Sequence, residues 1–347
     1  MPRCASLLLL VALAVTPVLA QPNLTVPRTS PYAEVHQRVG LTDLAVTYHR
    51  PAVNDRELWG GLVPYGQVWR AGANENTVFT TSSDITVAGQ PLPAGRYGLH
   101  LLPQESGPWT LIFSTMADAW GSFSYDEAED ALRVAVTPRE GPHQERLQYT
   151  FENPDNRRAE LALHWGETVV PVEIGVDSPA VVLANMEREL RGLPGFFWQG
   201  WNQIATFALQ QGHRLDDALG WADRSIGINV NATNRFTKAE ILAALGRDAE
   251  AEAAREEAFA VATEADVNQY GYVLLGRGEV DRAIEVFQRN VDAYPESWNV
   301  YDSLAEAYAA RGDTDRAIEL YERARSMAPA GQYARIDGVL ATLRGQP

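Results

Sequence analysis

The chain has 347 residues, and its 45 acidic residues outnumber its 29 Lys and Arg residues, which gives a formal net charge of −16 at pH 7. This excess of negative charge repels phosphate backbones and anionic lipid surfaces, so we expect no nucleic-acid partner. Hydrophobic residues make up 46% of the chain and there are 9 tryptophans, which excludes general disorder.

Residues 1–20 have the features of a secretory signal peptide. Arg3 supplies an early positive charge, Leu7–Val15 is apolar, and Ala20 is a small residue suited to cleavage. The apolar run is shorter than the ~20 residues that a membrane span needs. We therefore expect a periplasmic or secreted protein without a membrane span, from which Cys4, the only cysteine, leaves with the signal.

Residues 21–33 form an extended, proline-containing lead-in, and residues 34–177 have the pattern of an all-β domain. Apolar residues recur there with a period near two, broken every ten or so residues by Gly, Pro, Asn or Asp. This spacing predicts an antiparallel sandwich or barrel. Within it we expect separate strands beginning at Ala159 and at Thr168, and a long structured loop over residues 51–76.

Residues 178–347 have the pattern of a helical repeat domain. The hydrophobic period changes to about 3.6, and two units superimpose at a shift of 34 residues that aligns Gly278 with Gly312 and Phe287 with Tyr321. This length is typical of tetratricopeptide repeats, in which each unit buries its apolar face against its neighbours. We expect an all-α solenoid of four units, two of them degenerate, with a closing helix from Gln332.

The stretch from Tyr48 to Thr77 is the densest group of polar and aromatic residues. Arginine offers a planar fork for a carboxylate or phosphate, and tryptophan a flat face for a sugar or cation. We expect a site for a small polar ligand or peptide, in which Gly72 turns the chain so that Glu75 folds back toward Arg70. The alternative is structural, with Arg70 and Glu75 fastening the loop and the tryptophans packed on the sandwich. The candidate ligand-binding residues are Arg50, Arg56, Trp69, Arg70, Asn74 and Glu75.

None of the usual short catalytic motifs occurs in the sequence. His49, His100 and His164 each lie in or beside a predicted strand and could meet as a zinc site, although single scattered histidines are more often ordinary strand residues. We expect no metal and no cofactor. An enzyme that uses His49 or His100 with Glu75 remains an alternative.

The first helix of each repeat lines the groove of this repeat class, so a protein or peptide partner is expected there. The alternative is a solvated face with no partner. Carrying the repeat register through the chain assigns to the groove Asn202, Thr206, Asn268, Tyr272, Asn299, Asp302 and Glu306.

Several motifs of the β-region belong together. They are Arg50-Pro51, the GGLVPYGQVWRAGANE stretch from Gly60 to Glu75, PAGRY from Pro93 to Tyr97, Trp120-Gly121, Asp130 and Arg133. On these motifs residues 28–177 resemble the bacterial proteins grouped as domain of unknown function 2911, and the repeats resemble the tail that many members carry. Gly98 and His100 stand where a serine and an aromatic residue are expected. The resemblance implies a secreted or periplasmic bacterial protein and no established activity.

These observations leave three functions open. The leading hypothesis is a non-enzymatic binding protein, in which the β-domain holds a small polar ligand or peptide and the repeats dock a protein partner. The second is a periplasmic hydrolase-like or metal-dependent enzyme built on the β-domain. The third is a purely structural scaffold.

Overall fold

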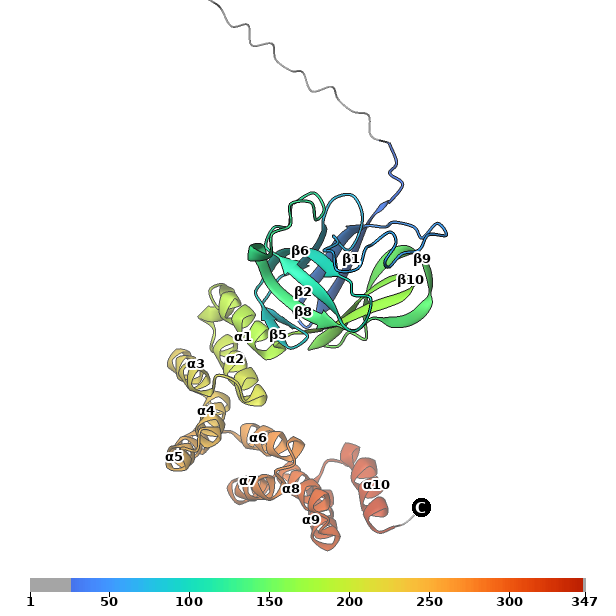
Figure 1. Cartoon of the computed structure of the whole chain (residues 1–347). Helices are drawn as coiled ribbons and strands as arrows, with labels where there is room; N and C mark the ends of the chain where they lie inside the picture. The colour runs from blue at the N-terminus through green and yellow to red at the C-terminus, as the bar shows by residue number, and fades with distance from the viewer. Residues whose placement is uncertain (1–25, 346–347) are drawn as a thin grey trace, which may run out of the picture. The chain divides into compact units, whose positions relative to one another are not determined.

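The computed structural model describes residues 26–345. The chain forms two compact units with the main division between Gly175 and Val176, a β-domain and a helical repeat domain (Figure 1). The predicted signal peptide and the first part of the lead-in lie outside the described residues and stay predictions. No helix within residues 26–345 is long and apolar enough to cross a membrane.

The β-domain consists of two sheets, as the alternating pattern predicts. All pairings with a defined register are antiparallel. In spatial order, the six-stranded sheet contains β1 (Tyr32–Val39), β2 (Thr42–His49), β3 (Thr77–Thr81), β6 (Gly95–Leu102), β7 (Trp109–Ser114) and β8 (Asp130–Val136). The four-stranded sheet contains β5 (Gln90–Leu92), β4 (Ile85–Val87), β10 (Arg158–Gly175) and β9 (Arg139–Glu152).

The core lies between the sheets and takes alternate residues of each strand. The rings of Phe79 and Phe113 meet at 5.3 Å on the inner face of the six-stranded sheet, and Tyr149 of β9 packs on Tyr48 at 4.8 Å. The intervening residues of β2, β3 and β7 therefore point to the outer face of the six-stranded sheet, where the candidate site lies.

Two features of the β-domain bear on the predictions. Residues 51–76 form the long structured loop that was expected, without a named strand or helix. The two strands predicted from Ala159 and Thr168 are wrong, because β10 is one strand of 18 residues. Its register shifts between His164 and Thr168, and Gly166 adopts a φ of +59° there, so the chain bends within the strand instead of turning back.

The repeat domain consists of antiparallel helix pairs, which confirms the predicted all-α tetratricopeptide architecture (Figure 1). Pairs form between α2 and α3, α4 and α5, α6 and α7, and α8 and α9. The helices are α1 (Ser178–Glu189), α2 (Trp198–Gln211), α3 (Leu215–Ile228), α4 (Ala232–Ala244), α5 (Asp248–Phe259), α6 (Glu264–Gly276), α7 (Val280–Ala293), α8 (Trp298–Arg311), α9 (Thr314–Met327) and α10 (Tyr333–Leu343).

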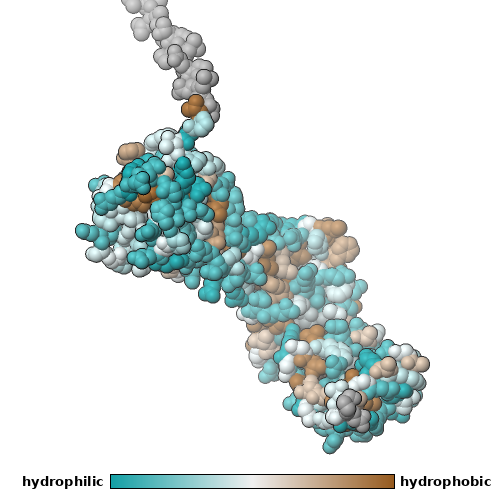
Figure 2. Space-filling view, turned by 90° about the vertical axis from the view of Figure 1, so that its right-hand side faces the viewer, coloured by the Kyte–Doolittle hydropathy of each residue, from teal (hydrophilic) through white to brown (hydrophobic). Residues whose placement is uncertain are grey.

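Small residues allow the paired helices to approach each other. In α6, a Cβ atom added to Gly271 would lie 2.4 Å from the ring of Phe287, which is fully buried in α7. The missing side chain therefore makes room for the aromatic ring of the partner helix. Apolar residues also reach the surface of the repeats in several places, among hydrophilic ones (Figure 2).

Candidate functional site

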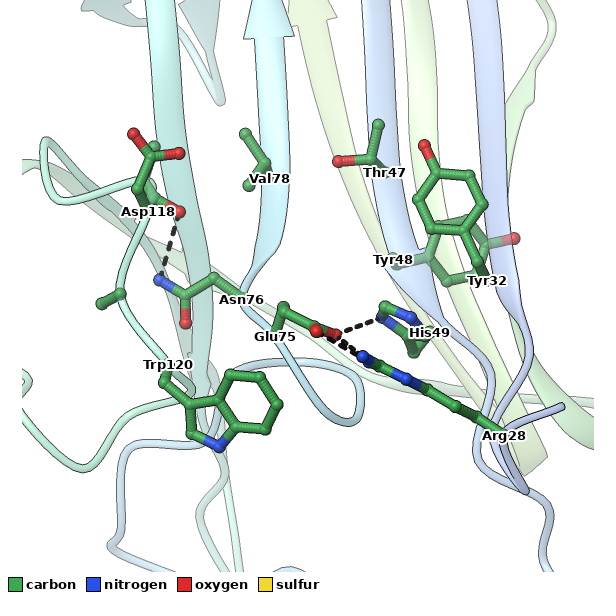
Figure 3. A pocket seen from close by; sticks show the side chains of 12 residues that line it. Arg28, Tyr32, Thr47, Tyr48, His49, Glu75, Asn76, Val78, Asp118 and Trp120 are labelled. Carbon is green, nitrogen blue, oxygen red and sulfur yellow. Dashed lines mark hydrogen bonds and ion pairs between the residues drawn. The ribbon is translucent and has the colours of Figure 1, made fainter. Parts of the chain in front are cut away.

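A pocket of about 460 Å³ lies on the outer face of the six-stranded sheet (Figure 3). Thr47 and His49 of β2 and Val78 of β3 form its floor, because they alternate with the core residues of those strands. Residues 117–120, which follow β7, form one wall, and Arg28 and Tyr32 border the opposite side. The pocket thus brings residues from the loop before β3 and from the chain ahead of β1 together over one sheet.

Glu75 is the centre of a charged group in this pocket. Arg28 Nη1 lies 2.7 Å and 2.6 Å from the two carboxylate oxygens of Glu75, and His49 Nδ1 lies 3.5 Å from Glu75 Oε2. The hydrogen bond from Arg28 lowers the pKa of Glu75, and burial lowers the pKa of His49. Glu75 is therefore a carboxylate at neutral pH, and His49 is a neutral imidazole beside it.

Asn76 brings an unpartnered acceptor to the pocket. Its side chain amide is held by the loop after β7, since Nδ2 donates to the carbonyl oxygens of Met116 at 3.2 Å and Ala117 at 3.5 Å. Those carbonyls only accept hydrogen bonds, which fixes the amide orientation and turns Oδ1 the other way, toward the space beside Trp120 (Figure 3). Asn76 is only 6% exposed, and its Oδ1 has no hydrogen-bond partner among residues 26–345.

The loop after β7 approaches the sheet closely because Gly98 has no side chain. A Cβ atom at Gly98 would lie 2.7 Å from the Met116 carbonyl oxygen and 3.1 Å from Asn76 Nδ2. Gly98, a position at which the family resemblance implies a serine, is thus the residue that lets this loop close over the sheet. Asp118 of the loop pairs with Arg96 at 3.2 Å, and the Trp120 indole is 58% exposed at the pocket.

Two of the predicted ligand-binding arginines serve the structure. Arg50 donates to the Leu147 carbonyl oxygen at 2.9 Å and to Gln148 Oε1 at 3.3 Å. Arg56 donates to the carbonyl oxygens of Val53 and Ala52 at 3.0 Å and 2.6 Å. Arg50 therefore fastens the chain after β2 to strand β9, Arg56 satisfies carbonyls of the irregular loop, and neither lines the pocket.

Trp69 packs inside the domain instead of forming a wall of the pocket. Its ring stacks on Trp165 at 5.5 Å and meets Trp59 edge-on at 5.7 Å, and Trp59 contacts Trp109 at 4.6 Å. Trp59 also donates to Thr168 Oγ1 at 2.9 Å. These positions agree with the structural alternative, in which the tryptophans of the loop pack on the sandwich.

The predicted pairing of Arg70 with Glu75 is wrong. Ala71 and Asn74 both have positive φ values, 49° and 59°, so the chain turns twice between the two residues and carries Glu75 to Arg28. Asn74 Nδ2 donates to the Ser30 carbonyl oxygen at 3.2 Å. Arg70 lies against Gly121, and its Nε has no hydrogen-bond partner among the described residues. Of the six predicted residues, only Glu75 lines the pocket.

The three strand histidines do not come together. His100 Nδ1 lies 2.8 Å from Ser122 Oγ, and His164 lies 2.9 Å from Thr150 Oγ1 and 3.0 Å from Glu152. His49 contacts Glu75, as described above. Within residues 26–345 no group of three His, Cys, Asp or Glu side chains could hold a metal ion.

A second pocket of about 240 Å³ lies along the first helices of the repeats, α2, α4 and α6. Asn202 and Thr206 line it, together with Phe236 of α4 and Val273 of α6. The Asn202 Oδ1 atom is buried and has no partner among the described residues. Two residues of the predicted groove set thus border a real depression, while Asn268, Tyr272, Asn299, Asp302 and Glu306 do not line it.

Three of the other predicted groove residues are engaged within the array. Asp302 is 6% exposed and accepts a hydrogen bond from Arg335 of α10 at 2.7 Å. Tyr272 donates to Glu306 Oε2 at 2.8 Å and lies 3.3 Å from Ser303 Oγ. These polar groups therefore form contacts between neighbouring helices of the array. The repeat register assigns residues to the groove but does not show such contacts.

Residues 30–174 match the family described as "Protein of unknown function (DUF2911)". The β-domain is a DUF2911 domain. Residues 274–343 match a tetratricopeptide repeat family, so both parts of the resemblance found in the sequence are confirmed. No curated protein matches the chain.

Three solved structures resemble the chain over 42% to 48% of its length. MamA residues 41 to the end from Desulfovibrio magneticus RS-1 shows 18% identity over 43% of this chain and 84% of that one, with a TM-score of 0.28. TTC0263, a thermophilic TPR protein of Thermus thermophilus, shows 20% identity over 48% and 91%, with a TM-score of 0.29. YrrB, described as a TPR protein with an unusual peptide-binding site, shows 17% over 42% and 77%, with a TM-score of 0.26. At these scores the likenesses carry no functional argument.

The pocket of the DUF2911 domain contains residues that sequence reasoning missed. Arg28 precedes the matched region and is 47 residues from its partner Glu75, so no local spacing links them. Asn76 lies within the stretch from Tyr48 to Thr77 but is not among the candidate residues, because its burial depends on the loop after β7, which is distant in the sequence. Trp120 belongs to one of the motifs that carry the family resemblance, and its exposure beside a pocket distinguishes it from the packed tryptophans.

Proposed function

We propose that this protein is an exported, non-enzymatic binding protein whose DUF2911 domain holds a small polar ligand and whose repeats dock a protein partner. The observation that carries the first part is the pocket over the six-stranded sheet. Small-molecule sites are concave and have a few convergent polar groups, and a buried polar atom without a partner is uncommon in a folded protein. Asn76 Oδ1 supplies such an atom in a pocket that also contains Glu75 and His49.

Ligand binding to the DUF2911 domain can be tested by thermal melting with envelope sugars, peptides and organic acids. A ligand present at 100 times its Kd stabilises the folded state by about 2.7 kcal/mol, which raises the Tm measurably. We expect a member of the panel to raise the Tm of the wild type and to lose that effect in Glu75→Gln, which removes the carboxylate charge. A panel that leaves the wild-type Tm unchanged throughout would contradict the proposal.

The tetratricopeptide repeats support a role in protein interaction, since stacked repeats create extended surfaces for partners. The pocket along α2, α4 and α6 combines apolar Phe236 and Val273 with the unpartnered side-chain oxygen Oδ1 of Asn202. This mixture suits an extended segment of a protein. Val273 is 38% exposed, so a charge there should interfere with docking more than with folding.

A pull-down from envelope extract with the full chain tests this docking. Val273→Glu should lose a partner that the wild type retains. Val261→Glu is the matched control, because Val261 is similarly exposed and does not line the pocket. Equal capture by both variants would show that the partner binds elsewhere.

One observation favours the enzyme alternative, namely the neutral imidazole of His49 beside the Glu75 carboxylate. A histidine oriented by a carboxylate is a common general base. If the protein is an enzyme of this kind, the purified protein should hydrolyse ester, glycoside or peptide substrates. The variant His49→Asn should lose that activity. Turnover that survives in His49→Asn would assign the activity to another group or to a contaminant.

Export can be tested separately by intact-mass measurement of the protein recovered from the periplasm or medium. The predicted signal peptide should be absent, with Gln21 as the first residue or close to it. Recovery of an exported chain that still begins at Met1 would contradict cleavage at Ala20.

A further inference from the structure

The charges of the DUF2911 pocket are balanced within the protein. Both carboxylate oxygens of Glu75 contact Arg28, and Asp118 pairs with Arg96. Burial lowers the pKa of His49 and so favours its neutral form. An anionic ligand would therefore meet an arginine that is already paired, and a cationic ligand would meet carboxylates that are already paired. The pocket suits an uncharged ligand.

The other groups of the pocket suit a ligand with many hydroxyl groups. Asn76 Oδ1 requires a donor, and Thr47, Tyr32 and the Glu75 carboxylate add donors and acceptors at the same place. The exposed indole of Trp120 borders this polar group on the side opposite Tyr32 (Figure 3). An aromatic surface beside convergent polar groups fits a sugar ring, which has an apolar C–H face and a rim of hydroxyls.

A peptide fits this place less well. Extended peptides bind by adding a strand to a sheet edge, where backbone N–H and C=O groups are free. The pocket lies on the face of the sheet, where β2, β3 and β6 already pair their backbone groups with each other. A peptide backbone would find no ladder to join there.

We propose that the pocket formed by Glu75, Asn76 and Trp120 binds a neutral saccharide, whose ring stacks on Trp120 and whose hydroxyls donate to Asn76 Oδ1 and Glu75. This inference rests on the proposed ligand-binding function of the DUF2911 domain and names the ligand class. The volume of about 460 Å³ lies in the range of about 300–1,000 Å³ that is typical of small-molecule sites.

Isothermal titration calorimetry of the full chain tests the proposal. The neutral probes are maltotriose, cellobiose and N,N′-diacetylchitobiose, and the charged comparators are glucuronate and glucosamine. We expect a neutral probe to bind, and Trp120→Ala to weaken its affinity about tenfold through loss of stacking. Trp120→Phe keeps an aromatic face and should lose less. Phe123→Ala is the matched control, because Phe123 is an 83% exposed aromatic residue of the same loop that does not line the pocket.

The possible outcomes separate this inference from the function on which it rests. Equal or tighter binding of glucuronate or glucosamine, or unchanged affinity in Trp120→Ala, would overturn the saccharide assignment. If all neutral probes fail while a peptide or organic acid raises the Tm in a Glu75-dependent way, the saccharide assignment fails and the proposed ligand-binding function stands. If nothing in either panel binds, both fail.

Discussion

His100 shows how a single buried residue ties the stability of the domain to pH. It is 2% exposed on the outer side of β6, and burial lowers its pKa from 6.5 to about 4. Between these two values the unfolded chain binds a proton that the folded protein does not bind. The stabilisation associated with neutral His100 is therefore complete above pH 6.5 and is lost as the pH falls toward 4. The free energy of unfolding should decrease by about 3 kcal/mol over this range.

We predict that His100→Gln flattens this part of the pH dependence. Urea unfolding at pH 7 and pH 4 should show that the free energy of unfolding falls by about 3 kcal/mol more in the wild type than in His100→Gln. His143→Gln, at an exposed histidine of β9, is the control and should behave like the wild type. A fall of the same size in His100→Gln would mean that other groups cause the acid sensitivity.

Glu240 is a second residue whose environment is invisible in the sequence. It is 7% exposed in α4 and accepts hydrogen bonds from Tyr270 at 2.6 Å, Arg282 at 2.6 Å and Arg277 at 3.2 Å. Its partners lie 30, 42 and 37 residues further along the chain, on the next repeat. No periodic pattern links residues at these separations, so only the stacked repeats reveal the network.

We predict that Glu240→Ala destabilises the repeat domain by roughly 1–3 kcal/mol, because the buried Tyr270 hydroxyl loses its acceptor and the partly exposed Arg277 and Arg282 lose a charged partner. Glu250→Ala is the matched control, since Glu250 pairs with Arg247 at the surface and such pairs contribute about 1 kcal/mol or less. Guanidinium chloride unfolding measures both. Similar midpoints for the two variants would show that the Glu240 network adds no stability.

At the level of elements, alternation in the sequence was sufficient to find most strands but not to count them. In β2 the burial of Leu44, Val46 and Tyr48 follows the period of two in the sequence. In β10 the pattern is interrupted at Gly166, and an interruption looks the same whether the chain turns back or bends within one strand. The distinction depends on the pairing of β10 with β9, which is a property of two elements and not of one.

Helix α6 contains two glycines that should respond in opposite ways to substitution by alanine. Gly271→Ala would place a methyl group 2.4 Å from the Phe287 ring, so we predict a loss of about 1–3 kcal/mol through overpacking. Gly276 has nothing within 4 Å of an added Cβ, so Gly276→Ala should be neutral or gain up to about 1 kcal/mol in helix propensity. Thermal melts of the two variants measure the difference, and a gain in Gly271→Ala would contradict the close packing of α6 on α7.

At the level of the whole molecule, the order of a β-domain and a repeat domain follows from composition and hydrophobic period alone. The position of the ligand pocket does not, because its lining comes from the lead-in, β2, β3 and the loop after β7. Sequence reasoning grouped residues that are close along the chain. The fold instead collects residues that lie on one face of the sheet, and Glu75 is the only one of the six candidate ligand-binding residues that lines the pocket.

We predict that residues 179–347 fold without the DUF2911 domain, because each repeat buries its apolar face against its neighbours. The clusters around Phe287, Leu304 and Tyr321, and around Ile204 and Trp221, consist entirely of residues from this region. Circular dichroism of the isolated fragment should show a helical spectrum and a cooperative melt. A disordered spectrum would mean that the repeats require the rest of the chain.

The pairing of Glu75 with Arg28 has a consequence for the evolution of the pocket. The match to the family begins at residue 30, so the counter-charge of Glu75 comes from the segment ahead of it. Segments outside the core elements accept substitutions more freely than strands, because few packed contacts constrain them. One substitution at Arg28 would convert the pocket from balanced to acidic while leaving the sheet intact. Relatives with the same β-domain can thus diverge in ligand preference through a residue that a comparison of the domain alone would overlook.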